Sequence, residues 1–375
     1  MTDRRDTDYR FDRVGTLEDL RALREEWDAL AGRVADPGYF HEFDWYFALS
    51  SHLLDMDPLV FTCRIDGGLV GVFPLVRYHR AEGVHRYRAL TSPRNAHHPL
   101  ADFVIDRDHV SPKILNALFR HLGREDDLGW DVIELFRTRE RSCIVASMDG
   151  ARRRVARADT DESSFIPCAS PEDLAGLSKK QRKNVARLRR KAGDEVGPVE
   201  VRGFPGVVGA GVDAFSAVEA SGWKGDTSTA IAADPATDGF YREVMESFAR
   251  RGAARVDVLS IGGRDAAAHM AVRAGAVWYL LKIGHDPDFA RYGPGAILLD
   301  QFLQEMAETA GVDEVNLVTG PQWAARWHPR TEPVWTVRLY SGSPVGRVRS
   351  ASRGVVEMVR SGRDFWQRHK RGSGA

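Results

Sequence analysis

The chain has 375 residues, of which 43 % are hydrophobic and 28 % are charged, and its 53 Lys and Arg residues balance 53 Asp and Glu residues. A net charge of zero argues against a global field that would draw the chain to DNA or to a membrane surface. Because the N-terminus is charged and no window approaches the roughly 20 apolar residues that span a bilayer, we expect a soluble, cytoplasmic protein.

Residues 1–150 are predicted to form one domain in which helices and strands alternate. The pattern predicts, in order, helices over 17–30 and 40–53, strands over 58–65, 69–76, 87–90 and 101–105, a helix over 112–122 and a strand over 130–136. The strands on either side of Asp66-Gly67-Gly68 are expected to form a hairpin, because this sequence favours a tight turn. Together these elements indicate an α/β fold with a mixed sheet.

The loop before the strand at 101–105 carries polar residues that suit a binding site. His97, His98 and Asp102 are close in sequence, and they could face a second domain and line a groove for an acceptor. They could also bind a metal ion, although this spacing of two histidines and an aspartate is weak evidence for one. Packing of the loop without any ligand is the third interpretation.

Residues 151–194 are predicted to be a linker that includes a basic helix. Between Ser178 and Gly193 the chain has eight Lys and Arg residues and no acidic residue. Such a helix is often only a solvated surface, but the lack of acids also suits contact with donor phosphates, an anionic acceptor or tRNA. The helix has no aromatic side chain on which a base could stack.

Residues 195–340 are predicted to form a second domain of the same style, followed by a basic helical tail over 341–375. The expected elements are a strand over 199–204, helices over 210–221 and 235–250, strands over 255–261, 266–273 and 277–283, a helix over 296–310, a strand over 314–318, a short helix over 322–327 and a strand over 334–340. We interpret the tail as a packing or dimer helix, and membrane contact is the alternative.

The most informative stretch of the chain is 279–307. A β-rich segment ends at the turn His285-Asp286-Pro287-Asp288, and Gly293-Pro294-Gly295 then leads into an amphipathic helix. A strand, a glycine loop and a helix N-terminus in this order can bind an anion, because glycine lets the backbone approach a phosphate and the first N–H groups of the helix point at it. A tight helix entry with Pro at its first position is the plainer interpretation.

This order of elements resembles the fold of the GNAT acyltransferases. In that fold the fourth strand ends at a loop and helix that hold the pyrophosphate of coenzyme A, and the fourth and fifth strands part so that pantetheine bonds to the open edge. By resemblance these strands are Trp278–His285 and Glu314–Val318. Gly293 and Gly295 fit the glycine spacing of the loop signature, and Ala290 stands at its usual Arg or Gln position.

A closer resemblance is to the CelD-like branch of these acetyltransferases, which is named from cellulose-biosynthesis clusters. His285-Asp286, Gly293-Pro294-Gly295 and the stretch from Gly320 to Trp327 stand where that branch has Tyr-Asp, Ser-Pro-Gly and a Gly…Trp ending. Its members look like tandem GNAT domains, a layout shared with the FemABX peptidyltransferases. The resemblance implies two tandem GNAT-like domains packed together, with a degenerate first domain on the acceptor side and the donor site in the second.

The acyl transfer implied by this resemblance needs few protein groups. A carboxylate or a histidine must take a proton from the acceptor amine, directly or through a water molecule. Asp286 and His269 are the first candidates for this base, and Glu219 is the third. Each has a structural alternative, because Asp286 could cap its own turn, His269 could be a paired histidine on a buried strand, and Glu219 could be a solvated helix carboxylate.

Further residues are assigned to the two ligands by resemblance and by position. The donor, acyl-CoA with an acetyl or longer chain, is expected to contact Lys282, Ile283, Gly284, Arg291, Tyr292, Gly293, Gly295 and Ala296. The amine acceptor is expected to contact Trp223, Lys224, His98, Asp102, Asn316 and Trp323. The three cysteines are far apart and form no CxxC pair, and no metal is expected.

Three functions are compatible with these observations. The leading hypothesis is an N-acyltransferase that moves an acyl group from acyl-CoA or an acyl carrier protein to an amine of a sugar, an amino acid or a natural-product intermediate. The second is aminoacyl transfer of the FemABX kind from a charged tRNA. The third is a non-catalytic scaffold of a polysaccharide-synthesis complex.

Overall fold

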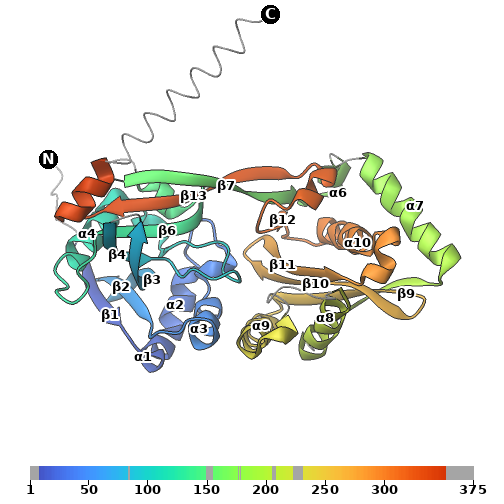
Figure 1. The fold of residues 1–375 in the computed structure, drawn as a ribbon, viewed down its shortest axis with the longest axis horizontal. Helices are drawn as coiled ribbons and strands as arrows, with labels where there is room; N and C mark the ends of the chain where they lie inside the picture. The colour runs from blue at the N-terminus through green and yellow to red at the C-terminus, as the bar shows by residue number, and fades with distance from the viewer. Residues whose placement is uncertain are drawn as a thin grey trace, which may run out of the picture.

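The structure, a computed structural model, describes residues 8–82, 85–148, 155–175, 177, 179–204, 208–222 and 231–351. Within these residues the strands form one mixed sheet of 13 strands in the order β1-β2-β3-β4-β6-β13-β7-β12-β11-β10-β9-β8, and β5 pairs with β3 beside this path. Helices α1 to α3 lie below one half of the molecule, and α8 and α9 lie below the other half (Figure 1). The protein therefore has the α/β fold that the sequence predicts.

The first half contains most of the elements expected from its sequence. With η for a 3₁₀ helix, they are β1 Arg10–Val14, α1 Leu17–Ala22, α2 Arg24–Ala31, η1 Tyr39–His41, α3 Phe43–His52, β2 Leu59–Ile65, β3 Gly68–Glu82, β4 His85–Thr91, β5 Val104–Ile105, η2 Arg107–His109, α4 Pro112–Leu122, β6 Val132–Arg139 and α5 Cys143–Ala146. The hairpin is confirmed, because β2 pairs with β3 and the turn residues Asp66 and Gly67 have φ values of 49° and 83°. The helix expected over 17–30 is interrupted at Leu23.

The second half also follows its prediction closely. Its elements are β7 Val155–Pro167, α6 Pro171–Ala175, α7 Lys179–Glu195, β8 Val199–Gly203, α8 Val208–Gly222, η3 Ile231–Ala233, α9 Pro235–Ala249, β9 Ala254–Ile261, β10 Arg264–Ala274, β11 Val277–His285, η4 Pro287–Tyr292, α10 Pro294–Glu308, β12 Glu314–Asn316, η5 Gln322–Trp327 and β13 Arg330–Tyr340. The basic helix predicted between the halves is α7.

Two long strands, β7 and β13, run through both halves of the sheet (Figure 1). They pair antiparallel from Arg330 opposite Phe165 to Leu339 opposite Val155. The latter part of β13 also pairs with β6, and the end of β7 pairs with β12. The predicted linker over 151–194 therefore differs from the structure, because residues 155–167 are a strand of the sheet. The tail predicted over 341–375 lies outside the described residues beyond residue 351.

The sheet contains two parallel strand pairs, and both open toward the middle of the molecule. β4 pairs with β6 from Ala89 opposite Val132 to Thr91 opposite Glu134, and β11 pairs with β12 only over 277–279. Because three antiparallel pairings, β6 with β13, β13 with β7 and β7 with β12, separate them, β6 and β12 run in opposite directions and point toward each other along the sheet. We call the divergence of β4 from β6 the first gap and that of β11 from β12 the second gap.

The two halves share a hydrophobic core on the α3, α8 and α9 side of the sheet. Helix α3 packs on α9, and the rings of Trp45 and Phe240 meet edge to face with centroids 5.1 Å apart. Tyr39 and Tyr279 make a similar contact at 5.0 Å. Burial of such large aromatic side chains contributes roughly 2–3 kcal/mol for each one. The two gaps are therefore held at a defined separation by a packed interface.

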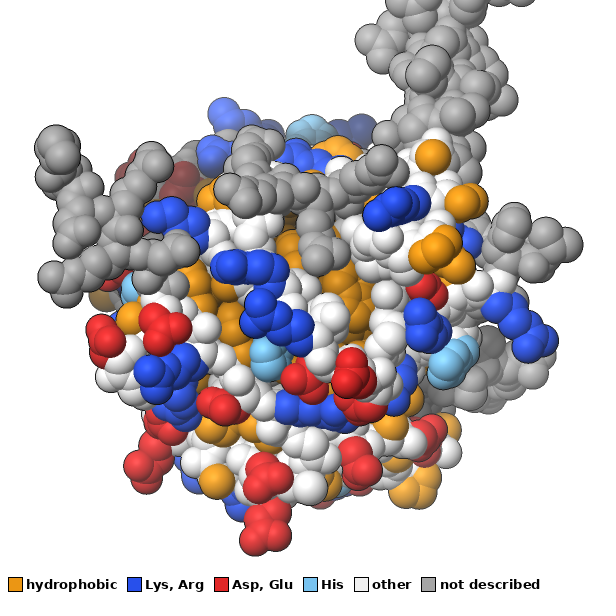
Figure 2. Space-filling view, turned by 90° about the vertical axis from the view of Figure 1, so that its left-hand side faces the viewer, with side chains coloured by type: hydrophobic (Ala, Val, Ile, Leu, Met, Phe, Trp, Pro, Cys, Tyr) orange, Lys and Arg blue, Asp and Glu red, His pale blue; other side chains and the backbone are white. Residues whose placement is uncertain are grey.

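The end of the molecule formed by the first half has a mixed surface. Acidic and basic side chains alternate over this face, with hydrophobic side chains exposed between them (Figure 2). Within the part of the chain that the structure describes, no helix combines the length and the apolar character needed to cross a bilayer.

Candidate functional site

The second gap leaves one edge of β11 open. β12 pairs with Val277, Trp278 and Tyr279 of β11, and within the described residues it pairs with none of 280–285. The other edge of β11 remains paired with β10 as far as His285 opposite Ala267. The backbone N–H and C=O groups of an unpaired edge can bond to an extended ligand. The predicted donor contacts Lys282, Ile283 and Gly284 all lie on this open part of β11.

The glycine loop brings the N-terminus of α10 to the end of β11. Gly293 is the N-cap of α10 and has φ 59°, a left-handed conformation that glycine adopts without strain. Its N–H group donates to Ala290 O at 3.0 Å, and the N–H groups of Ala296 and Ile297 both donate to Gly293 O. Gly295 is exposed, and a Cβ placed on it would meet no atom within 4 Å. Gly295 is thus the place where an anion can approach the helix.

Helix α7 closes the other side of this loop. Leu188 Cδ1 lies 3.0 Å from where a Cβ on Gly293 would stand, so a larger residue there would have to displace the Leu188 side chain slightly. Tyr292 is buried, and its hydroxyl donates to Glu195 Oε2 of α7 at 3.0 Å. Arg291 lies 3.6 Å from the same carboxylate. Tyr292 and Arg291 therefore hold α7 against the loop.

A polar cluster lies beside the second gap on the face covered by α8 and α9. Lys282 of β11 is partly buried, and its Nζ lies 5.5 Å from the ring centre of Tyr241 of α9. Glu219 of α8 packs on β11, because a Cβ on Gly284 would be 3.7 Å from Glu219 Cβ. Glu219 is 9 % exposed and accepts the N–H of Ile231 at 2.7 Å. The structure thus brings together Glu219, Lys282 and Gly284, which the sequence analysis had assigned to one reaction.

The first domain reaches this cluster through its loop 92–99. His97 Nδ1 lies 3.1 Å from the hydroxyl of Tyr241. Burial and the nearby charge of Lys282 lower the pKa of His97 to about 4. Burial also lowers the pKa of Lys282, and the charge of Glu219 opposes this shift. For Tyr241, burial and then the charge of Glu219 raise the pKa of the phenol. At neutral pH this cluster therefore holds a neutral imidazole and a neutral phenol.

Asp286 and His269 are placed in structural interactions. Asp286 accepts the N–H of Asp288 at 2.9 Å as the N-cap of η4, and it also pairs with Arg264 at 3.2 Å. His269 is 2 % exposed under α10, with its Nε2 2.8 Å from Asp257 Oδ2. Burial alone would raise the pKa of Asp257, but the contacts with His269 and Arg255 outweigh it and lower the pKa. Both candidates thus occupy the positions given by their structural alternatives, and their catalytic role stays a prediction.

The predicted acceptor residues are dispersed. Asp102 accepts from Ser142 Oγ at 2.7 Å and is turned into the first domain. Asn316 is fully buried, and its Oδ1 accepts from the N–H of Val318 at 2.8 Å. Trp323 is 38 % exposed on η5. The remaining two predictions, Trp223 and Lys224, lie outside the described residues.

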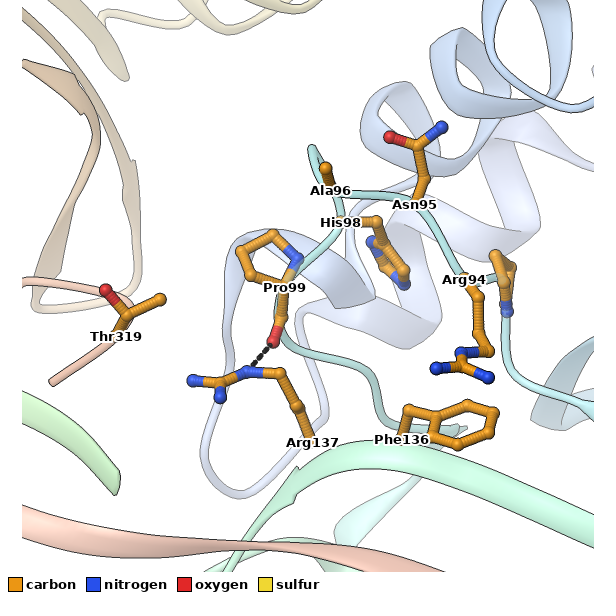
Figure 3. A pocket seen from close by; sticks show the side chains of 9 residues that line it. Arg94, Asn95, Ala96, His98, Pro99, Phe136, Arg137 and Thr319 are labelled. Atoms are coloured by element: carbon orange, nitrogen blue, oxygen red, sulfur yellow. Dashed lines mark hydrogen bonds between the residues drawn. The ribbon is translucent and has the colours of Figure 1, made fainter. Parts of the chain in front are cut away.

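His98 does face a cavity, which lies at the first gap. This pocket of about 500 Å³ is lined by the loop 92–99, by Phe136 and Arg137 of β6, and by Thr319 from the segment after β12 (Figure 3). Trp45 Nε1 donates to His98 Nδ1 at 2.9 Å, which leaves the Nε2 of a neutral ring to carry its proton. Burial lowers the pKa of His98 to about 4. Among the described residues, no three His, Cys, Asp or Glu side chains come together as a metal site.

Tyr241, Arg94 and Arg137 lie at these sites but were not predicted as site residues from the sequence. Tyr241 lies on a helix with several other aromatic and apolar residues, so its position gave no sign that its hydroxyl meets His97. Arg137 has φ 50°, which is unusual for a residue with a side chain, but no sequence pattern indicates it. A basic residue at the end of a buried strand was the one signal that could have singled it out.

Comparisons with known proteins agree with this geometry. Residues 179–340 match the model of a family described as an acetyltransferase (GNAT) domain. No curated protein matches the chain by sequence. Among solved structures, FemX is similar with a TM-score of 0.61 at 11 % identity, with 87 % of this chain and 98 % of FemX covered.

Two further structures have the same fold. One is the C-terminal domain of a putative lysylphosphatidylglycerol synthetase from Agrobacterium fabrum, with a TM-score of 0.54 at 11 % identity over 89 % of this chain and 96 % of that chain. The other is L-PGS from Bacillus licheniformis, with 0.53 at 13 % identity over 91 % and 98 %. The predicted fold class, two GNAT-like domains in tandem, is confirmed, and the family match supports an acyltransferase.

Proposed function

We propose that the protein is an N-acyltransferase that moves an acyl group from an acyl thioester, such as acyl-CoA, to an amine in the cytoplasm. The observation that carries this proposal is the open edge of β11 over 280–285, which lies between the N-terminus of α10 and the cluster of Lys282, Glu219 and Tyr241. An extended pantetheine arm can bond to such an edge as an added strand. The motif resemblance to the CelD-like branch supports the same activity.

The proposed reaction uses groups that already surround the second gap. Glu219 takes the proton of the attacking amine, and the amine nitrogen then forms its bond to the thioester carbonyl carbon. The N–H groups of β11 stabilise the oxyanion, because an unpaired edge offers donors without any rearrangement. Collapse of the tetrahedral intermediate breaks the carbon–sulfur bond. The ammonium of Lys282 lies in the same cluster and stabilises the departing thiolate by its charge.

The test is release of free thiol from acetyl-CoA and from longer acyl-CoAs in the presence of a panel of amines. Binding of each thioester is measured in parallel by calorimetry, which does not depend on the acceptor. We expect at least one thioester to bind and to lose its acyl group to an amine. Absence of binding across the whole series would contradict the proposal.

Aminoacyl transfer from a charged tRNA is the second candidate, and helix α7 favours it. Lys179, Lys180, Lys183, Arg187 and Arg190 are exposed on α7, beside the loop that Leu188 covers. In the loop, Gly295 is therefore almost the whole surface that is open to a diphosphate. The basic helix, in contrast, offers a long phosphate-binding surface. One of the similar structures is a domain of a putative lysylphosphatidylglycerol synthetase, and another is named L-PGS.

Native mass spectrometry of the purified protein separates the two donors. A bound thioester supports the first candidate, and co-purified tRNA supports the second. Charge reversal at Lys183 and Arg190 tests the same point, because it should abolish binding of tRNA while thioester binding stays unchanged. If tRNA does not bind to the wild-type protein, the second candidate is excluded.

A further inference from the structure

The pocket at the first gap is lined on its polar side by hydrogen-bond donors. Its polar lining comes from Arg94, Asn95, His98, Arg137 and Thr319, and no carboxylate is among the residues that line it. The donors come from both domains. Thr319 follows β12 in the second domain, whereas the other residues lie in the first domain, either after β4 or near the end of β6. A cavity whose polar groups are mainly donors suits a ligand with negatively charged oxygen atoms.

Arg137 is held in place by its neighbours. Its Nε donates to Pro99 O at 2.6 Å (Figure 3). Its Nη1 pairs with Asp161. Its Nη2 is buried and has no hydrogen-bond partner among the described residues. Arg137 also has φ 50°, and a residue with a side chain adopts this conformation at a cost of about 1–2 kcal/mol. An unpaired buried donor on a strained backbone is typical of a residue that is positioned for a ligand.

Arg94 and His98 supply two further donors. The guanidinium of Arg94 lies over the ring of Phe136 at 4.0 Å, and stacking of this kind leaves its edge N–H groups free to donate. Within the described residues Arg94 has no ion pair with an acidic side chain. His98 is neutral, and its Nε2–H is its remaining donor because Nδ1 accepts from Trp45. The pocket thus combines the guanidinium of Arg94, that of Arg137 with Asp161 as its counterion, and a neutral donor.

The segment that brings Thr319 to the pocket is also strained. Val318 has φ 66°, which is rare for a β-branched residue, and its N–H is held by buried Asn316. The N–H of Ser164 on β7 donates to Thr319 O at 3.0 Å. The chain leaves β12 at the second gap and reaches the first gap three residues later. A ligand in the pocket would therefore lie at the boundary between the two domains, on the path to the donor site.

We propose that this pocket binds a carboxylate or phosphate group of the substrate, through Arg94 and Arg137. That the bound group belongs to the acceptor of the transfer rests on the proposed function. That the pocket binds an anion does not depend on it. The acceptor is then an amine that also carries an acidic group, anchored at the first gap with its amine directed toward the second.

The experiment measures anion binding by ligand-observed NMR with the full-length protein. The probes are inorganic phosphate, acetate and, as a neutral probe of similar size, isopropanol. Arg94→Gln and Arg137→Gln remove the two charges one at a time. Arg120→Gln, on the exposed face of α4, is the matched control. Thermal unfolding of each variant reports whether it folds as the wild type does.

We expect phosphate or acetate to broaden in the presence of the wild-type protein and isopropanol to remain sharp. Each of the two pocket variants should raise the Kd of the bound anion by roughly tenfold or more, because a charged hydrogen bond is lost, and Arg120→Gln should not change it. The anion that binds with the lower Kd identifies the acidic group of the substrate as a phosphate or a carboxylate. Equal binding by wild type and both pocket variants, or an equal loss in Arg120→Gln, would overturn the inference.

A second measurement, of thioester binding, keeps this test separate from that of the proposed function. Thioester binding is measured by calorimetry on the same wild-type and Arg137→Gln samples. If anions bind through Arg94 and Arg137 but no thioester binds, the pocket stands and the proposed function fails. If thioesters bind and no anion does, the pocket inference fails and the proposed function stands.

Discussion

The first and second gaps are built alike but carry different chemistry. Each forms where two parallel strands pair for three residues and then diverge, and the two gaps open toward each other. The first is lined by arginines and a neutral histidine and includes a pocket of about 500 Å³. The second has a helix N-terminus at its mouth and a carboxylate, Glu219, beside Lys282. The same fold thus provides a donor-rich cavity at one gap and a carboxylate beside an open strand edge at the other.

This difference fits the proposed function, in which the second gap carries the reaction and the first gap holds the acceptor. A proton acceptor belongs where the new bond forms, and fixed positive charge belongs where a substrate is only held. If the comparison is correct, a change in the second gap should act on kcat, whereas a change in the first gap should act on acceptor binding or on stability.

Glu219→Gln tests whether the second gap carries the chemistry. The amide oxygen of Gln can still accept the N–H of Ile231, so the fold is preserved while the base is lost. We expect kcat for acyl transfer to fall by roughly 10²–10⁴-fold, with a much smaller change in the donor KM. Asp286→Asn is the matched control, because Asp286 caps a turn and its substitution should leave kcat within the same order of magnitude. A larger loss in Asp286→Asn than in Glu219→Gln would reverse the assignment.

His269→Ala tests whether the pair under α10 belongs to the second gap or only supports it. Removal of the imidazole breaks a buried pair with Asp257, so the free energy of unfolding should fall by about 3–5 kcal/mol. Urea denaturation measures this loss. The kcat of the protein that remains folded should stay within the same order of magnitude, and His269→Gln should recover part of the stability. A collapse of kcat in His269→Gln at normal stability would make His269 a catalytic residue.

A pH titration of stability tests the first gap. The pKa of His98 is about 4 in the folded protein and about 6.5 in the unfolded chain, so the unfolded state binds more protons between these values. Stability should therefore fall as the pH falls from 6.5 to 4, by up to about 3 kcal/mol from His98 alone. His98→Asn keeps an acceptor for Trp45 without a titrating group, and it should flatten this part of the curve. An unchanged slope would show that His98 is not held neutral.

Paired glycine substitutions test where an anion approaches α10. Gly293→Ala should lower stability by about 1–2 kcal/mol, because its φ is 59° and a methyl group would press on Leu188. Gly295→Ala lies in open space in a helix and should leave stability unchanged or raise it by up to about 1 kcal/mol. If the donor phosphates approach at Gly295, this variant should nevertheless raise the donor KM by roughly tenfold, a cost of about 1.4 kcal/mol. An unaltered KM would move the donor away from this helix.

Elements that depend on local sequence could be predicted well. The meander β9, β10 and β11 was expected from its apolar strands and from the glycines at its turns, and Gly262, Gly263 and Gly275 do have positive φ values. Helix α4 was predicted with its observed bounds, because Pro112 starts it and an apolar stripe runs along it. The structural alternative for Asp286, a capped turn, was likewise evident from the sequence His285-Asp286-Pro287-Asp288.

Elements that depend on distant partners could not be predicted. The segment 159–164 is polar and was interpreted as part of a linker, yet it lies in β7 because β13, more than 150 residues away, supplies its hydrogen bonds. The contact of His97 with Tyr241 spans 144 residues of sequence. The pocket at the first gap needs Thr319 from the second domain. A single sequence contains the residues of these sites, but only the fold shows which of them meet.

The shared strands β7 and β13 have a consequence for how the protein can be divided. β6, in the first half of the chain, pairs with β4 on one edge and with residues 334–340 of β13 on the other. During synthesis, the edge of β6 therefore stays uncovered until almost the whole chain has left the ribosome. A gene cut at residue 150 would yield a fragment with that edge exposed, and such edges favour aggregation. The two halves should instead recover solubility only when they are produced together, as a complementing pair.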